Sequence, residues 1–178
     1  MKKLIFGCLL CSSLVLADGF TLTSDVISGQ LGNEQVLNGF GCKGDNISPK
    51  LSWAKAPAGT KSFAVTMYDP DAPTGSGWWH WVVFDIPSDT TSIAKNSGDV
   101  SLNLMPQSVI QSITDFGKSG YGGACPPVGH GAHKYIFTVY ALDVEKLGLD
   151  VNASPALVGF MLNSHTLAKA SIIAYYGR

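Results

Sequence analysis

The segment MYDPDAP, residues 67–73, constrains the fold most, because it ends an apolar strand in two carboxylates held between prolines. Proline fixes φ and lacks a donor N–H, so Pro70 and Pro73 terminate the strand that precedes them. Residues two apart in an extended segment point the same way, so Asp69 and Asp71 are expected to share one face. The sequence therefore predicts a strand that presents a rigid acidic pair at its end.

A second strand is predicted over residues 80–86, after a short glycine-rich break, and it ends at Pro87. Regular alternation along this strand places His80, Val82 and Phe84 together on one face. The neighbouring tryptophans are interpreted as packing residues, since aromatic side chains bury large areas in protein cores.

A second polar cluster comes later, in the glycine- and proline-rich stretch of residues 121–135. Most of it belongs to a long segment, residues 115–131, for which no regular structure is predicted. Loops of this length are usually functional or disordered. Because apolar strands flank it, we favour a functional loop that meets the acidic pair in one small pocket.

The remaining patterns predict an antiparallel, mainly β fold. Further strands are expected at residues 20–23, 51–53, 62–68, 135–141 and 171–176, whereas residues 100–113 give no firm assignment. Ser154 before Pro155 is a helix-start signal, and the apolar stripe after it predicts a helix of about 15 residues, to about Lys169. We therefore expect a two-sheet β-sandwich with a C-terminal helix and a final short strand.

Residues 1–17 have the features of a secretory signal peptide, with two lysines before an apolar run and a small residue at its end. The run is short and interrupted for a membrane anchor, and the apolar stretch before Cys8 is short for a lipoprotein site. We expect cleavage after Ala17, a single domain over residues 18–178, and a periplasmic or secreted location.

Removing this segment leaves two cysteines, Cys42 and Cys125, each in a glycine- or proline-rich loop. An even pair in an oxidising compartment favours a disulfide. Two free, partly buried thiols are the alternative at this point.

The overall charge argues against one class of partner. The formal net charge is -1, with charged residues sparse and of both signs. An extended nucleic-acid surface needs a basic stripe. We therefore expect no nucleic-acid partner.

In combination, the polar motifs resemble those of the phosphatidylethanolamine-binding protein family. The matching segments are DPDAP at residues 69–73, WH at 79–80, GACPP at 123–127 and GAHKY at 131–135. Two further elements, FGC at 40–42 and SPKLSW at 48–53, look like the bacterial branch often called Raf kinase inhibitor-like proteins. Any one motif is weak alone, but together they cover essentially the whole mature chain.

The resemblance implies a small cavity that takes phosphate, phosphorylethanolamine or similar groups. Carried over by motif, its lining residues are Asp69, Asp71, His80, His133 and Tyr135. The rim would be the segment 122–127, including Gly123 and Pro126, whose backbone N–H groups are available to an anion. Lys134 stands where Arg is common in the family, but strand parity places it opposite His133. The resemblance also implies a homodimer.

Two carboxylates in one cavity create a physical difficulty for a phosphate ligand, because like charges repel. Anion binding then requires a protonated His80 or His133, a protonated aspartate, or a ligand that brings its own cation. We therefore favour a zwitterionic or phosphomonoester ligand whose affinity falls as pH rises through the histidine range. His130 and His165 have no comparable support from the sequence.

Two other classes of function stay open. Two histidines and two aspartates are compatible with a metal site or with acid–base hydrolysis of a phosphoester. The sequence contains no nucleophile elbow, HExxH motif or P-loop, so we expect no metal, no cofactor and no catalysis. The family also includes inhibitors of kinases and of serine peptidases, so the alternative is a protein partner bound at the same pocket.

Overall fold

The structure is a computed structural model that describes residues 19–178, and the expected signal peptide lies outside the described residues. The described chain is mainly β and antiparallel, as expected, with one α-helix near the C-terminus. The strands are β1 (Thr21–Thr23), β2 (Asn38–Gly39), β3 (Cys42–Lys43), β4 (Leu51–Ala54), β5 (Ser62–Asp69), β6 (Trp78–Pro87), β7 (Ser92–Ile93), β8 (Ile110–Gln111), β9 (His133–Leu142) and β10 (Thr166–Tyr176). The helix α1 spans Pro155–His165, and short 3-10 turns lie at Asn33–Gln35 and Val100–Leu102.

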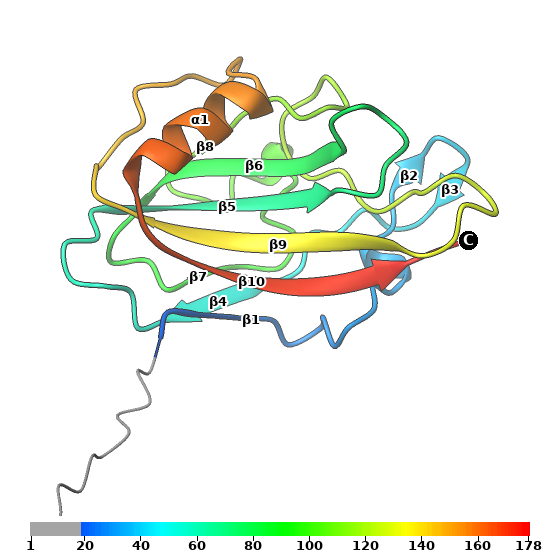
Figure 1. Cartoon of the computed structure of the whole chain (residues 1–178), viewed down its shortest axis with the longest axis horizontal. Helices are drawn as coiled ribbons and strands as arrows, with labels where there is room; N and C mark the ends of the chain where they lie inside the picture. The colour runs from blue at the N-terminus through cyan, green and yellow to red at the C-terminus, as the bar shows by residue number, and fades with distance from the viewer. Residues whose placement is uncertain (1–18) are drawn as a thin grey trace, which may run out of the picture.

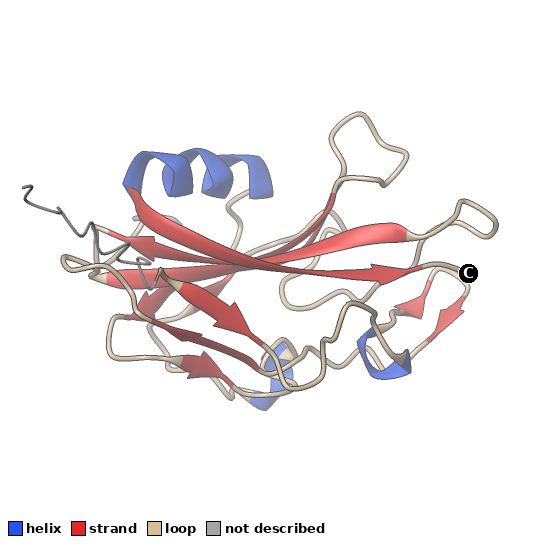
Figure 2. Ribbon diagram, turned by 60° about the horizontal axis from the view of Figure 1, so that its bottom comes forward, coloured by secondary structure: helices blue, strands red, loops and turns tan. Residues whose placement is uncertain are grey.

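The strands form two main sheets and a small hairpin. The five-stranded sheet has the order β10-β9-β5-β6-β8, the three-stranded sheet has the order β1-β4-β7, and β2 pairs only with β3. Figure 2 shows α1 on one side of the five-stranded sheet and the three-stranded sheet on the other. The five-stranded sheet is therefore covered on both faces, which explains why β5 and β6 are buried along almost their whole length.

Two apolar clusters fill the spaces on either side of that sheet. The larger cluster lies between the sheets and includes Trp53, Phe63, Trp81 and Phe137. The smaller one lies beneath α1, where Val158 and Leu162 meet residues of β6 and β9. Burying each such side chain contributes about 1.5–3 kcal/mol, so these clusters hold the layers together.

The helix begins where the sequence predicts and ends earlier. Ser154 Oγ accepts a hydrogen bond from the Leu157 N–H at 3.3 Å, and Pro155 occupies the first helical turn. The helix ends at His165, so it has 11 residues and does not reach Lys169. No helix within residues 19–178 is long and apolar enough to cross a membrane.

The final strand takes the residues that the helix does not. β10 starts at Thr166, directly after α1, and has 11 residues, so the expectation of a short strand was wrong. It pairs with β9 from Thr166 opposite Leu142 to Tyr176 opposite His133. This ladder supplies hydrogen bonds along one side of the strand, apart from a register shift between Thr166 and Ala168, and overrides the local helical pattern near Lys169.

A β-bulge changes the expected facing of His80. Met67 pairs with Trp81 and Tyr68 pairs with Trp79, which leaves His80 as the extra residue. The His80 ring packs against Tyr135, on the side of the larger cluster, whereas Val82 and Phe84 belong to the cluster beneath α1. Regular alternation therefore does not extend to His80, and its expected face was wrong.

Candidate functional site

The candidate site lies at one end of the five-stranded sheet, where three strand ends meet. Asp69 is the last residue of β5, Trp78 is the first of β6, and His133 is the first of β9. Both β6 and β9 run antiparallel to β5, so the start of each lies beside the end of β5. Figure 1 shows this end on the right, together with the β2–β3 hairpin and the C-terminus. The sheet thus brings together the two polar stretches that the sequence singles out.

A cavity of about 270 Å³ opens between these strand ends. It is lined by Phe40, Asp69, Ala72, Pro73, Thr74, Trp78, His80, Phe116, Cys125, Pro126, Pro127, His133 and Tyr135. The predicted residues Asp69, His80, Pro126, His133 and Tyr135 are all in this set. The other walls are mostly aromatic rings and prolines, so the polar groups face a largely apolar space.

Asp69 and His133 form a buried pair in the wall of the cavity. His133 Nδ1 lies 2.7 Å from Asp69 Oδ2, and the two side chains are 2% and 3% exposed. The other carboxylate oxygen, Asp69 Oδ1, accepts the N–H of Asp71 at 2.8 Å. Because a carboxylate accepts hydrogen bonds, the proton of this pair is carried on His133 Nδ1. This contact fixes the orientation of the His133 ring.

The pair extends to an exposed third residue, His130. His130 Nδ1 lies 2.7 Å from His133 Nε2, so both ring nitrogens of His133 have a partner. Asp69, His133 and His130 therefore form a continuous chain from the buried strand end to the surface loop. Sequence patterns offered no support for His130, because only the loop conformation brings it onto His133.

His80 is held in a neutral form by its surroundings. Its Nδ1 lies 2.8 Å from the carbonyl oxygen of Gly122, which only accepts, so Nδ1 carries the proton. Burial lowers the pKa of His80 to about 4, and the backbone carbonyl of Gly122 only partly offsets this effect. Its ring stands edge-on to Tyr135, with ring centroids 5.2 Å apart. At neutral pH His80 therefore supplies no positive charge, contrary to one of the protonation routes considered from the sequence.

Tyr135 brings an unpaired hydroxyl to the cavity. Its Oη is fully buried and makes no hydrogen bond of ordinary geometry with a described residue, although the Asp69 carboxylate and the Cys125 backbone lie near it. Burial, followed by the charge of Asp69, raises the pKa of Tyr135 well above its ordinary value, so the hydroxyl keeps its proton. The indole N–H of Trp78, another lining residue, is also buried and unpartnered within the described chain. Such groups are costly unless something pairs with them, so the cavity is suited to a ligand with acceptor atoms.

Asp71 lies outside the lining of the cavity. Its Oδ2 accepts the backbone N–H of Lys134 at 2.8 Å, and its Oδ1 lies 3.5 Å from Lys134 Nζ. The hydrogen bond from the Lys134 backbone, aided by the charge of Lys134, lowers the pKa of Asp71. Among the described residues Asp69 alone therefore contributes a carboxylate to the cavity, which weakens the expected repulsion of an anion.

Gly123 also lies outside the cavity lining and has a structural constraint of its own. Its N–H donates to Asn46 Oδ1 at 2.8 Å, so this donor is already occupied. A Cβ at this position would lie 2.4 Å from the carbonyl oxygen of Gln35 and 2.5 Å from the Leu37 nitrogen. Glycine is needed here because two backbone segments approach each other closely.

The rim of the cavity is fixed covalently and by the C-terminal residue. Cys42 and Cys125 form a disulfide, which decides between the two possibilities that the sequence left open. Arg178 Nε donates to the carbonyl of Pro126 at 2.6 Å, and its Nη1 donates to the carbonyl of Gly41 at 3.0 Å. The disulfide and the guanidinium join the same two loops, so both hold the β2–β3 hairpin against the Cys125–Pro126 segment.

The hairpin carries an aromatic residue, Phe40, that the sequence placed in a motif but not among the cavity residues. Phe40 is 73% exposed, and its backbone has φ of 49°, a left-handed conformation that is uncommon outside glycine. Its ring stacks on Phe116 at a centroid distance of 5.8 Å. The glycines on both sides of Phe40 were the available signal of a tight turn that presents this side chain.

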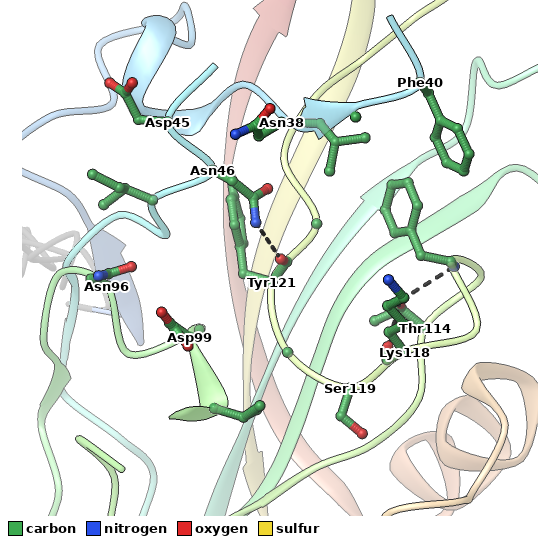
Figure 3. A pocket seen from close by; sticks show the side chains of 18 residues that line it. Asn38, Phe40, Asp45, Asn46, Asn96, Asp99, Thr114, Lys118, Ser119 and Tyr121 are labelled. Atoms are coloured by element: carbon green, nitrogen blue, oxygen red, sulfur yellow. Dashed lines mark hydrogen bonds between the residues drawn. The ribbon is translucent and has the colours of Figure 1, made fainter. Parts of the chain in front are cut away.

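Behind the Phe40–Phe116 pair lies a second, wider groove of about 700 Å³. Figure 3 shows Asn38, Asp45, Asn96, Lys118 and Ser119 around it, with Phe40 at one side. The Asn46 side chain in this groove is occupied, because its Nδ2 donates to the Tyr121 carbonyl at 3.1 Å and its Oδ1 accepts from Gly123. The cavity and the groove thus share one aromatic wall, Phe40 and Phe116.

The side-chain geometry does not present a ready metal site in the described chain. Over residues 19–178, no group of three or more His, Cys, Asp or Glu side chains is arranged to hold a metal ion.

Comparison with protein families gives a match over most of the chain. A family model described as phosphatidylethanolamine-binding protein matches residues 27–177. The UPF0098 protein YbhB of Escherichia coli K12 is 54% identical over 156 residues, covering 87% of this chain and 98% of YbhB. The UPF0098 protein YbcL of the same organism is 48% identical over 180 residues, covering 99% of this chain and 98% of YbcL.

Solved structures agree with this match. The crystal structure of E. coli YbcL, described as a new member of the mammalian PEBP family, has a TM-score of 0.87 and 50% identity over 89% of this chain and 98% of YbcL. A phosphatidylethanolamine-binding protein homologue from Chlamydia trachomatis, CT736, has a TM-score of 0.74 and 25% identity, over 91% of this chain and 99% of CT736.

Among more partial sequence matches, LppC of Mycobacterium tuberculosis, named as a lipoprotein, is 40% identical over 59% of this chain and 48% of LppC.

Proposed function

The chain belongs to the phosphatidylethanolamine-binding protein family, and from this premise we propose that it is an exported, non-catalytic protein that binds a phosphate-type head group. The ligand occupies the cavity at the ends of β5, β6 and β9. Its anionic group meets Tyr135 and His80, and the rest of the ligand leaves between Phe40 and Trp78.

The observation that carries this proposal is the buried, unpartnered hydroxyl of Tyr135 in the cavity wall. Leaving such a group unpaired costs about 1–3 kcal/mol, so native structures seldom keep one without a reason. An acceptor oxygen of a bound ligand or a water molecule removes this cost. The aromatic and proline walls of the cavity are poorly polar, and such surroundings strengthen a hydrogen bond made against them.

A zwitterionic head group fits the remaining walls. Aromatic faces attract cations within about 6 Å, and Phe40, Trp78 and Phe116 line the cavity. Asp69 adds a carboxylate to the same lining. An ethanolamine-type ammonium group therefore has partners in the same cavity as its phosphate.

Two observations support export. The disulfide between Cys42 and Cys125 is typical of an oxidising compartment. The similarity to LppC, a protein named as a lipoprotein, points the same way. We place the mature protein in the periplasm or outside the cell, after removal of residues 1–17, where we expect it to form a homodimer.

Calorimetric titration of the mature protein with phosphorylethanolamine tests the function. We expect binding at pH 5.5 that weakens at pH 8, and a loss of about 1.5–3 kcal/mol in the Tyr135→Phe variant, the range for a hydrogen bond to a charged group. Tyr175→Phe is the matched control, because this tyrosine is exposed and lies outside the cavity lining.

Tyr135→Phe is informative because it removes an unpaired hydroxyl and leaves the ring in place. Its free energy of unfolding is expected to stay equal to or above that of the wild type, so lost binding reports on the ligand and not on the fold. Absence of heat at both pH values, with the protein folded, would refute the proposed ligand class.

A protein partner is the second candidate, favoured by the exposed Phe40 and by the groove beside it. A partner segment with an anionic side chain would enter the cavity and continue along the groove, and a kinase or peptidase held in this way would be inhibited. If phosphorylethanolamine competes with such a partner, the two share the Tyr135 cavity. If it does not compete, the partner binds elsewhere.

A further inference from the structure

The cavity offers few groups with unused hydrogen-bonding capacity, and these define the ligand that fits. Both carboxylate oxygens of Asp69 accept hydrogen bonds, and both ring nitrogens of His133 have partners. Among the side chains that line the cavity, the second nitrogen of His80 and the donors of Tyr135 and Trp78 have no hydrogen-bond partner within the described chain.

The open nitrogen of His80 accepts and does not donate. The Gly122 carbonyl fixes the proton of the neutral ring on Nδ1, which leaves a lone pair on Nε2. Desolvation lowers the pKa of His80 to about 4, so this assignment holds throughout the neutral range. A ligand atom facing Nε2 therefore needs a hydrogen to give.

The cavity also lacks a permanent positive charge. No Lys or Arg side chain is among the described residues that line it, whereas the carboxylate of Asp69 is. Arg178 stands at the rim, where it donates to the carbonyls of Pro126 and Gly41. Such a site favours a monoanion over a dianion, because charge repulsion in a poorly solvated cavity is strong.

We propose that the cavity selects a phosphomonoester in its singly protonated, monoanionic form. The ligand's P–O–H donates to His80 Nε2, and its other oxygens accept from Tyr135 Oη–H and from the Trp78 indole N–H. This inference rests on the proposed head-group function and adds the protonation state to it. A sulfate ester or a phosphodiester has no such proton and leaves the lone pair of His80 facing an oxygen.

A matched pair of ligands tests the proposal on the mature, disulfide-intact protein. Phosphorylethanolamine and ethanolamine sulfate have a similar shape, but only the phosphate group carries a P–O–H proton in mildly acidic solution. At pH 5.5 we expect the phosphate to bind at least about tenfold more tightly, the effect of one unpaired buried acceptor. Between pH 5.5 and pH 8 its affinity should fall by roughly tenfold or more, since the second pKa of a phosphomonoester is about 6.

The sulfate ester also separates the ligand's proton from those of the protein. It stays a monoanion over this range, so any pH dependence that comes from the protein acts on both esters alike. The titratable and charged groups that face the site are His80, Asp69, His133, Tyr135, His130, Asp115 and Arg178. The ratio of the two affinities therefore measures how much the ligand's own proton contributes to binding.

The His80→Gln variant tests whether His80 is the residue that accepts a hydrogen bond from that proton. Its amide can donate as well as accept, so the ratio of phosphate to sulfate affinity should approach one. His165→Gln is the control, because His165 pairs with the exposed Asp143 outside the cavity, and it should leave the ratio unchanged. If His80→Gln does not fold, the affinities of the two esters for the wild-type protein at the two pH values still test the proposed protonation state.

The possible failures are distinguishable. Absence of binding by either ester refutes the head-group function itself. If the two esters bind equally, or if the phosphate binds more tightly toward pH 8, the proposal of a singly protonated ligand is refuted. The head-group function is not affected by that outcome.

Discussion

Asp69 accepts a hydrogen bond from His133 with both side chains almost fully buried, whereas Asp143 makes the same kind of contact with His165 at the surface. We predict that Asp69→Ala lowers the free energy of unfolding by about 1–3 kcal/mol, because it leaves the His133 Nδ1–H unpaired in the interior. Urea unfolding at pH 7 measures this cost. Asp143→Ala should cost at most about 0.5 kcal/mol, as is usual for exposed pairs. Equal costs for the two variants would show that the buried pair does not organise the site.

His80 gives stability a specific pH dependence. Its pKa is about 4 in the folded protein, against 6.5 for a solvated histidine, so between these values the unfolded chain binds the extra proton. The contribution of His80 to the free energy of unfolding is therefore fully present above pH 6.5. It is lost as pH falls toward 4, by roughly 3 kcal/mol in total. We predict that the difference in unfolding free energy between wild type and His80→Gln shrinks by that order from pH 7 to pH 4.

Urea unfolding of both proteins at several pH values measures this difference. The subtraction matters because carboxylates such as Asp71, whose pKa is lowered by the Lys134 backbone hydrogen bond, lose stability over the acid range in both proteins. A difference that stays constant with pH would mean that His80 is not a buried neutral residue.

At the scale of elements, α1 depends on its start signal. Ser154 Oγ caps the helix by accepting the Leu157 N–H, whereas Ser164 Oγ lies near the other end and only donates to the Phe160 carbonyl. We predict a loss of about 1 kcal/mol for Ser154→Ala and less than about 0.5 kcal/mol for Ser164→Ala, measured by urea unfolding. A larger effect at Ser164 would contradict the assignment of the cap.

The β-bulge in β6 is the element that makes the pocket. Without the extra residue, regular alternation would turn His80 toward the cluster under α1, together with Val82 and Phe84. With it, His80 faces Tyr135 across the cavity. Bulges often redirect a side chain near a binding site, which is the role this one has here.

At the scale of the whole molecule, the disulfide joins segments separated by 83 residues. We predict that the Cys42→Ser/Cys125→Ser double variant loses about 2–4 kcal/mol, because the unfolded chain regains the entropy that the cross-link removes. Urea unfolding with and without a thiol reductant measures it. The reductant should lower the wild-type midpoint to that of the variant and leave the variant unchanged.

The same variant should loosen the rim without abolishing the cavity, since Arg178 still bridges the Gly41 and Pro126 carbonyls. A reductant-insensitive wild type together with two titratable thiols in the native protein would contradict the bridge.

Much of the fold was predictable because it follows from local patterns. The strand of residues 62–68, its stop at Pro70 and the Ser154–Pro155 helix start appear where the sequence indicates. The length of the helix was not predictable, because the residues after His165 obtain their backbone partners from β9, far away in the chain. Family motifs placed Asp69, His80, His133 and Tyr135 in one cavity, but they also included Asp71, which bonds to Lys134 instead.

By itself the sequence determined the chemistry available to this protein: which of the longer strands form, which carboxylates and histidines stand at their ends, and which cysteines can pair. These features depend on periodicity, on proline and glycine, and on residue identity, all of which are local. Only the tertiary structure decided which atoms remain unpaired. The bulge that turns His80, the loop that brings His130 onto His133 and the hairpin that presents Phe40 all arise from contacts between distant segments. The hydrogen-bonding capacity left open to a ligand is what remains after those contacts are made.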